Sequence, residues 1–211
     1  MSAKPDFTHL HVHSEFSLLD GMSNLEALME ETKRLGMDSI ALTDHGALYG
    51  SVQFVQAAKQ FGIKPIIGVE TYVARRGMRD KEGKADQQPF HLIALATSGT
   101  GYRNLCRLVT DAHLDGMYYK PRIDKEQLAK YSEGLICLSG CITGEINQFI
   151  LADQPEQARQ SVQLRSTPRC MHGHETRIAR IVRRKHRVGV LLRAQTPQQS
   201  IGFQACPTAG G

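Results

Sequence analysis

Residues 36–44 read GMDSIALTD, and residues 62–70 read GIKPIIGVE. Each stretch opens on a glycine, continues through a short apolar run and closes on a carboxylate, and the two are offset by 26 residues. Apolar residues recur at helical spacing before each glycine, so each unit predicts a helix that ends at the glycine and a buried strand that follows it. Strands that alternate with helices favour a parallel α/β sheet, either open or closed into a barrel.

The segment before the first unit predicts another strand and the start of its helix. Residues 7–13 alternate in polarity and are rich in β-formers, which indicates a strand. Ser23 and Glu26 have the spacing of a capping box, so we expect a helix to begin at Ser23.

The segment after the second unit continues the pattern. Apolar runs at 92–96 and 135–138 predict further strands, and Asp124 with Gln127 predicts a short capped helix between them. Residues 74–89 are polar and mixed in charge, and we interpret them as an inserted loop. In folds of this kind, polar residues at the carboxyl ends of strands gather at one rim, where active sites lie.

Side chains that can bind metals occur at successive predicted strand ends. His11 and His13 are two residues apart, which on a strand puts both imidazoles on one side. The next strands end in Asp44-His45, Glu70 and Ser139-Gly140-Cys141. Each feature alone is common, because histidines also occur in cores and on surfaces, and Asp44 is placed to cap a helix. Their recurrence at four predicted strand ends favours a metal site at the rim.

The predicted ligands also restrict the choice of metal. Imidazole, carboxylate and thiolate groups suit Zn²⁺, Mn²⁺ or Fe better than Mg²⁺ or Ca²⁺, which prefer oxygen ligands. So many such groups at one rim of the sheet indicate two or three ions. Paired ions suit phosphoester hydrolysis, because they activate a water molecule and hold both the attacking and the leaving oxygen.

Several motifs occur in a characteristic order. They read HLHVHSEFSLLDG at 9–21, LTDHG at 42–46, GIKPIIGVE at 62–70, TGYRNL at 100–105 and SGC at 139–141. With these motifs, roughly residues 5–160 resemble the PHP (polymerase and histidinol phosphatase) family, in the branch found in bacterial replicative DNA polymerases.

This resemblance implies a distorted (β/α)7 barrel that holds up to three metal ions. The ligand set that it implies is His11, His13, Asp20, His45, Glu70, His91 and Cys141. Asp44 would then be a supporting or capping carboxylate, and no catalytic residue is assigned beyond the ligands. His91 enters through the resemblance alone, because it precedes its apolar run. Family members also supply a late Asp-x-His pair of ligands that this sequence lacks, so we expect an incomplete barrel.

The net charge of +5 is unevenly distributed. Residues 161–211 carry nine basic residues and one acidic residue, whereas residues 1–160 carry 17 basic and 20 acidic residues. We therefore predict a PHP-like metal-binding domain at 5–160. We expect 161–211 to be a basic tail, disordered or non-native and outside the fold, with a frameshift as its possible origin. Within this tail, residues 183–187 have the form of a nucleic-acid patch, and His172-Gly173-His174 is a weak candidate for a metal site.

A second candidate for nucleic-acid contact lies in the first part of the chain. Tyr118-Tyr119-Lys120-Pro121-Arg122 joins aromatic rings to two cations, a combination that can contact a phosphate or a nucleic-acid strand. The alternative interpretation is an ordered surface loop.

Three functions stay open. In the first, the chain is the amino-terminal PHP domain of a replicative DNA polymerase, with a phosphoesterase site of the 3′–5′ exonuclease type. The full-length protein would polymerise DNA with Mg²⁺ beside other replicase subunits, whereas 211 residues are too few to polymerise. The second is a stand-alone phosphoesterase for a small phosphate ester. The third is a non-catalytic scaffold that docks a polymerase or a proofreading partner.

Composition bears on the expected compartment. The sequence contains no run of about 18 apolar residues and no apolar signal segment, so we expect neither membrane insertion nor secretion. The five cysteines are widely spaced and do not form a disulfide framework, which favours the cytoplasm.

Overall fold

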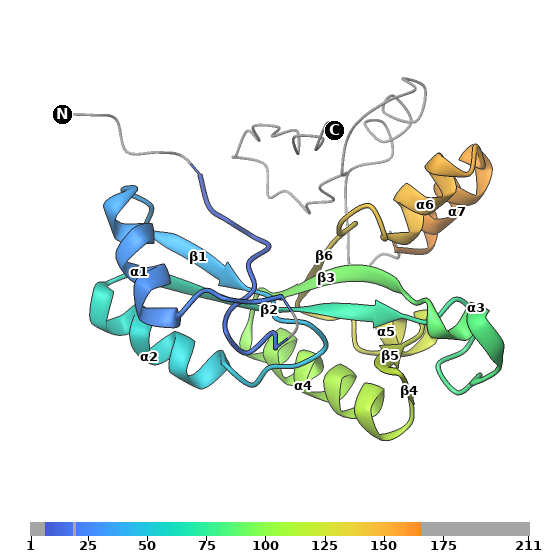
Figure 1. Ribbon diagram of the computed structural model, residues 1–211, viewed down its shortest axis with the longest axis horizontal. Helices are drawn as coiled ribbons and strands as arrows, with labels where there is room; N and C mark the ends of the chain where they lie inside the picture. The colour runs from blue at the N-terminus through green and yellow to red at the C-terminus, as the bar shows by residue number, and fades with distance from the viewer. Residues whose placement is uncertain (1–6, 19, 166–211) are drawn as a thin grey trace.

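The computed structural model describes residues 7–18 and 20–165, which form a mixed α/β fold (Figure 1). The described helices are α1 (Leu25–Arg34), α2 (Ser51–Phe61), α3 (Gly83–Gln87), α4 (Gly99–Leu114), α5 (Lys125–Lys130), α6 (Glu145–Leu151) and α7 (Pro155–Arg165). The described strands are β1 (Ser39–Leu42), β2 (Lys64–Val73), β3 (Phe90–Ala96), β4 (Met117–Tyr118), β5 (Lys120–Ile123) and β6 (Leu135–Leu138). Residues 161–165 continue α7, whereas the rest of the predicted tail, including 172–174 and 183–187, lies outside the described residues.

The long strand β2 organises the sheet, which is not closed among the described residues. The strand order is β4-β5-β2-β3-β6, and β1 pairs in parallel with the first part of β2. Near its end β2 pairs in parallel with β5, but along its other edge it pairs antiparallel with β3. The prediction of a parallel sheet is therefore wrong for β3. The connection from β2 to β3 contains only the short helix α3, and an antiparallel neighbour needs no full crossover.

The two repeated units fold as expected. Helices α1 and α2 end before glycines in the left-handed region, with φ of 73° at Gly36 and 70° at Gly62. The expected start of α1 is wrong by one residue, because Asn24 is its N-cap. The Asn24 side chain accepts hydrogen bonds from the backbone N–H groups of Glu26 and Ala27. Asparagine is as good an N-cap as serine, so the capping-box pattern did not separate the two.

Residues 7–13 run beside β1 but do not form the predicted strand. His9 makes an isolated parallel bridge with Ile40. Further along, the Thr43 backbone N–H donates to the Val12 carbonyl at 2.8 Å, and the Val12 N–H donates to the Thr43 hydroxyl at 2.9 Å. A side-chain hydroxyl thus replaces a backbone partner and interrupts the ladder. The segment still stays against β1, which positions the side chains of His11 and His13.

Two apolar clusters hold β2 in place. One packs α4 against the sheet, as the ribbon in Figure 1 shows, and it includes the fully buried Val69, Leu92 and Leu105. The other joins α1 and α2 to β1 and includes Phe54 and Ile40. Burial of each such large side chain stabilises the fold by about 1.5–3 kcal/mol, so β2 is a rigid support for the polar residues that it carries.

Residues 74–89, predicted as a loop, are tied to the sheet by a buried cation. The Arg122 side chain is fully buried and donates hydrogen bonds to the carbonyl groups of Met78, Asp80, Asp86 and Gly116. The expectation that Arg122 contacts a phosphate or nucleic acid is therefore wrong, because its donors are used inside the protein. No helix in the described part of the chain is long and apolar enough to cross a membrane.

Candidate metal centre

Glu70 lies at the middle of the site. It lies within β2, opposite Ile93 of β3, rather than at the end of its strand as predicted. On the other edge of β2 it forms a parallel bridge with His45, and the Gly46 N–H donates to its carbonyl at 2.9 Å. The Glu70 side chain is only 2% exposed. Both edges of the strand are therefore paired at the point where this carboxylate enters the site.

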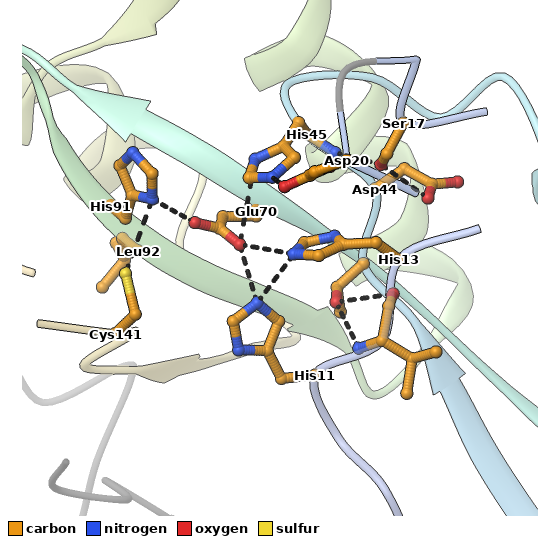
Figure 2. Close-up of polar contacts among 12 residues, drawn as sticks. His11, His13, Ser17, Asp20, Asp44, His45, Glu70, His91, Leu92 and Cys141 are labelled. Carbon is orange, nitrogen blue, oxygen red and sulfur yellow. Dashed lines mark hydrogen bonds and ion pairs between the residues drawn. The ribbon is translucent and has the colours of Figure 1, made fainter. Parts of the chain in front are cut away.

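Histidines from three segments converge on the Glu70 carboxylate (Figure 2). Nε2 of His11 lies 2.7 Å from Oε2, and Nε2 of His13 lies 3.1 Å from the same oxygen. Nδ1 of His91 contacts the other oxygen, Oε1. The Nε2 atoms of His11 and His13 are only 3.1 Å apart, so both rings aim at one point.

Asp20 and His45 form a second part of the site. Nε2 of His45 lies 2.8 Å from Oδ2 of Asp20 (Figure 2). The His45 ring stacks on the His13 ring, with centroids 4.2 Å apart, which joins this pair to the first group. The Nδ1 atoms of His13 and His45 are buried without a hydrogen-bond partner among the described residues, and Nδ1 of His45 lies 3.9 Å from Oε2 of Glu70.

His91 and Cys141 form the third part. The Cys141 sulfur lies 3.7 Å from Nδ1 of His91 and 2.9 Å from the Thr143 hydroxyl. Gly140 lets the two segments approach, because its φ is 76° and a Cβ there would lie 3.0 Å from the His91 carbonyl oxygen. The antiparallel direction of β3 places His91, near the start of that strand, opposite Tyr72 near the end of β2.

The seven predicted ligands thus form three overlapping groups, in each of which the ligand atoms lie within 4.8 Å of one another. The groups are His11-His13-Glu70, His13-Asp20-His45 and Glu70-His91-Cys141. Glu70 and His13 are each shared by two groups. Imidazole, carboxylate and thiol donors so close together, with two buried imidazole nitrogens that lack a hydrogen bond within the described part of the chain, fit transition-metal ions.

The neighbouring charges shift the pKa values of these groups. Burial by itself would raise the pKa of Glu70, but hydrogen bonds from His11, His13 and His91 hold it far below its usual range. Burial lowers the pKa of His91, but Cys141 and Glu70 together raise it to about 9. The hydrogen bond with His91 is the main cause that lowers the pKa of the Cys141 thiol to about 7. The hydrogen bond with Glu70 raises the pKa of His13.

Asp44 lies outside the three groups and faces the loop that follows His13. It is buried and accepts hydrogen bonds from the Ser14 N–H at 2.7 Å, the Ser14 hydroxyl at 2.9 Å and the Ser17 hydroxyl at 2.9 Å. Ser17 in turn accepts a hydrogen bond from the His45 N–H. Asp44 therefore fixes the loop after His13 against the backbone of His45.

Sequence reasoning missed Ser14, Ser17 and Tyr72 at this site. The Tyr72 ring lies nearly parallel to that of His45, with 5.9 Å between centroids, and meets the His91 ring edge-on at 5.2 Å. Burial, followed by the charges of Glu70 and Asp20, raises the pKa of Tyr72 to about 12. The i, i+2 spacing from Glu70 was the available signal for Tyr72, because both side chains leave the same face of β2.

Comparison with known families identifies the class of protein to which this fold belongs. The PHP-domain family model matches residues 9–165, so the chain belongs to the PHP family. PHP domains are metal-dependent phosphoesterases.

The relatives share one name, DNA polymerase III subunit alpha. The protein from Borreliella burgdorferi is 47% identical over 163 residues, which cover 77% of this chain and 14% of that protein. The protein from Thermus aquaticus is 49% identical over 162 residues, 75% of this chain and 13% of that protein. This chain is therefore homologous to the PHP region of these subunits and spans about 14% of their length.

Among solved structures, a two-domain protein from Bacteroides vulgatus contains a predicted PHP-like metal-dependent phosphoesterase. It aligns with a TM-score of 0.41 at 16% identity, over 74% of this chain and 48% of that chain.

Proposed function

We propose that this chain is the PHP region of a bacterial replicative polymerase alpha subunit and that its site hydrolyses phosphodiesters, as a 3′–5′ exonuclease does. The observation that carries the proposal is the buried Glu70 carboxylate, shared between two groups of ligand atoms. Glu70 would thus contribute ligand atoms to two neighbouring ions, and paired ions suit phosphoester hydrolysis.

The ligands in this proposal are His11, His13, Asp20, His45, Glu70, His91 and Cys141. They would hold two or three ions of Zn, Mn or Fe, because the donors are mixed nitrogen, oxygen and sulfur. Such ions supply a water molecule of lowered pKa and hold the attacking and leaving oxygens of a phosphoester.

The side chains of this chain orient and tune that centre. Glu70 stays ionised when it is buried, because the imidazoles around it lower its pKa. Asp44 fixes Ser17, and through it the backbone of His45, which keeps the His45 ring stacked on that of His13. Tyr72 packs against His45 and His91 and restricts their orientation.

The partners and compartment belong to the same proposal. A full-length protein of the kind named in the relatives would act on DNA in the cytoplasm, bind other replicase subunits and use Mg²⁺ for polymerisation. These 211 residues would supply only its PHP site.

The test is hydrolysis of thymidine 5′-p-nitrophenyl phosphate and of a single-stranded oligonucleotide by the full chain with added Mn²⁺ or Zn²⁺. We expect both substrates to be cleaved, and we expect Glu70→Ala to lower both activities at least 100-fold. Glu30→Ala, which removes an exposed carboxylate on α1, is the matched control and should leave activity unchanged.

Different outcomes would favour the alternatives. Cleavage of the small ester but not of the oligonucleotide would favour a small-molecule phosphoesterase. An unsubstituted chain that binds metal but cleaves neither substrate would favour a scaffold.

A further inference from the structure

We propose that the β4–β5 hairpin, residues 117–123, binds single-stranded nucleic acid beside the metal centre, with Lys120 on a backbone phosphate and Tyr119 stacked on a base. This inference rests on the proposed function and deepens it by naming the class of substrate. It uses the aromatic and basic segment that the proposed chemistry leaves unexplained.

Lys120 lies next to the metal centre. Its ammonium nitrogen lies 4.5 Å from the centre of the Tyr72 ring, and that ring lies 5.9 Å from the His45 ring. The distance from the ammonium nitrogen to the centre of the His45 ring therefore cannot exceed the sum of these two distances. Among the described residues no carboxylate pairs with Lys120, so its charge is available to a phosphate next to the one held at the centre.

The hairpin that carries Lys120 is held firmly. Arg122 on β5 pairs with Tyr72 on β2 and fixes residues 78–86 through its hydrogen bonds to backbone carbonyls. Pro121 packs so closely on Gly46 that a Cβ added to Gly46 would lie 2.8 Å from the proline ring. Figure 1 shows β4 and β5 beside the end of β2. The position of Lys120 relative to the site is thus set before any substrate binds.

Tyr119 forms the tip of the hairpin. It is 75% exposed, and its φ of 59° lies in the left-handed region, which costs free energy for a residue other than glycine. Its ring meets the ring of Tyr118 edge-on at 4.9 Å, and Tyr118 lies against the Arg122 guanidinium. An aromatic ring held in solvent at a strained position is suited to stack on an unpaired base.

The combination favours a nucleic-acid strand over a small ester. A small phosphate ester would need no contact beyond the metal centre itself. A nucleic-acid strand extends past the bond that is cleaved. A cation next to an aromatic ring can contact the following phosphate and base of that strand. Lys120 and Tyr119 are adjacent residues that offer these two groups on the same turn.

The first test is binding of a fluorescein-labelled dT12 oligonucleotide to the full metal-free chain, followed by anisotropy as salt is varied. Tyr119→Ala should weaken binding about fivefold or more, as for the loss of one base stack. Lys120→Met should lower the slope of log K against log salt by about 0.7, as for one phosphate contact.

Lys130→Met is the matched control, because Lys130 lies 4.9 Å from the Tyr131 ring in an equivalent contact on α5. Residues 161–211 are the same in every variant, so a difference between variants comes from the substituted residue. Equal binding by Lys120→Met, Tyr119→Ala, Lys130→Met and the unsubstituted chain would overturn the inference.

The second test is the ratio of kcat/KM for dT12 to kcat/KM for thymidine 5′-p-nitrophenyl phosphate. Lys120→Met should lower this ratio at least fivefold, and Lys130→Met should not change it. An equal loss on both substrates would contradict the inference. If the unsubstituted chain cleaves neither substrate, the proposed function fails, and the metal-free binding test still decides the role of the hairpin.

Discussion

His91, near the start of β3, contacts the carboxylate of Glu70, which lies within β2. The contact exists because β3 runs antiparallel to β2, so that the first residues of one strand lie beside the last residues of the other. A parallel β3 would place His91 at the opposite end of the sheet from Glu70. The direction of one strand therefore decides whether the third group of ligand atoms forms.

The pKa values of His91 and Cys141 predict how metal affinity depends on pH. The metal-free His91 imidazole holds a proton below pH 9, and the Cys141 thiol holds one below pH 7. A metal ion must displace these protons, so affinity should rise with pH, about tenfold per unit between pH 7 and 8.5 and more steeply below 7.

Competition with a chromophoric chelator between pH 6 and 8.5 measures this dependence. His91→Gln should remove most of the slope above pH 7. An affinity that does not change with pH in the unsubstituted chain would show that these two groups do not bind the metal.

Asp44 should matter for metal binding although it touches no ligand atom. Asp44→Asn places an amide N–H₂ where an oxygen accepts from Ser14 or Ser17, which should lower the free energy of unfolding by about 1–3 kcal/mol. Because the loop also holds His45, metal affinity should fall about 10–100-fold. Thermal unfolding and metal titration check both effects, with the exposed Asp153→Asn as the control. Unchanged affinity in Asp44→Asn would argue that the loop is dispensable.

Arg122 should be needed for stability. Arg122→Met leaves the buried carbonyl groups of Met78 and Asp86 and the partly buried one of Asp80 without their donor, so we expect a loss of about 3 kcal/mol or more in the free energy of unfolding. Urea unfolding measures the loss, and Arg103→Met, an exposed arginine on α4, should have an effect below about 0.5 kcal/mol. Equal effects of the two substitutions would refute this account of residues 74–89.

The sequence predicted the repeated helix–strand units well, because glycine stops and apolar runs are local features. It did not predict the direction of β3, since an apolar run looks the same in either direction. The only hint was the connection after Val73. It is polar, and it contains no apolar pattern long enough to form the helix of a crossover. His91 was found through family resemblance for the same reason.

The residues around the ligands were harder to predict. Ser14 and Ser17 contact Asp44 across about 30 positions of sequence, and such pairs depend on how the segments pack. The buried role of Arg122 was also hidden, because its place in an aromatic and basic run resembles a nucleic-acid contact. The proposed boundary after residue 160 and the frameshift origin of the tail stay predictions, which sequencing of the coding region across codons 155–170 would test.

Metal analysis tests the central claim most directly. The purified chain, equilibrated at neutral pH with Mn²⁺, Zn²⁺ or Fe²⁺ and then desalted without chelator, should retain two or more ions per molecule by inductively coupled plasma mass spectrometry. His11→Ala/His13→Ala should lose at least one of them, because His13 is shared by two groups of ligand atoms. A folded, unsubstituted chain that retains no metal would contradict the account.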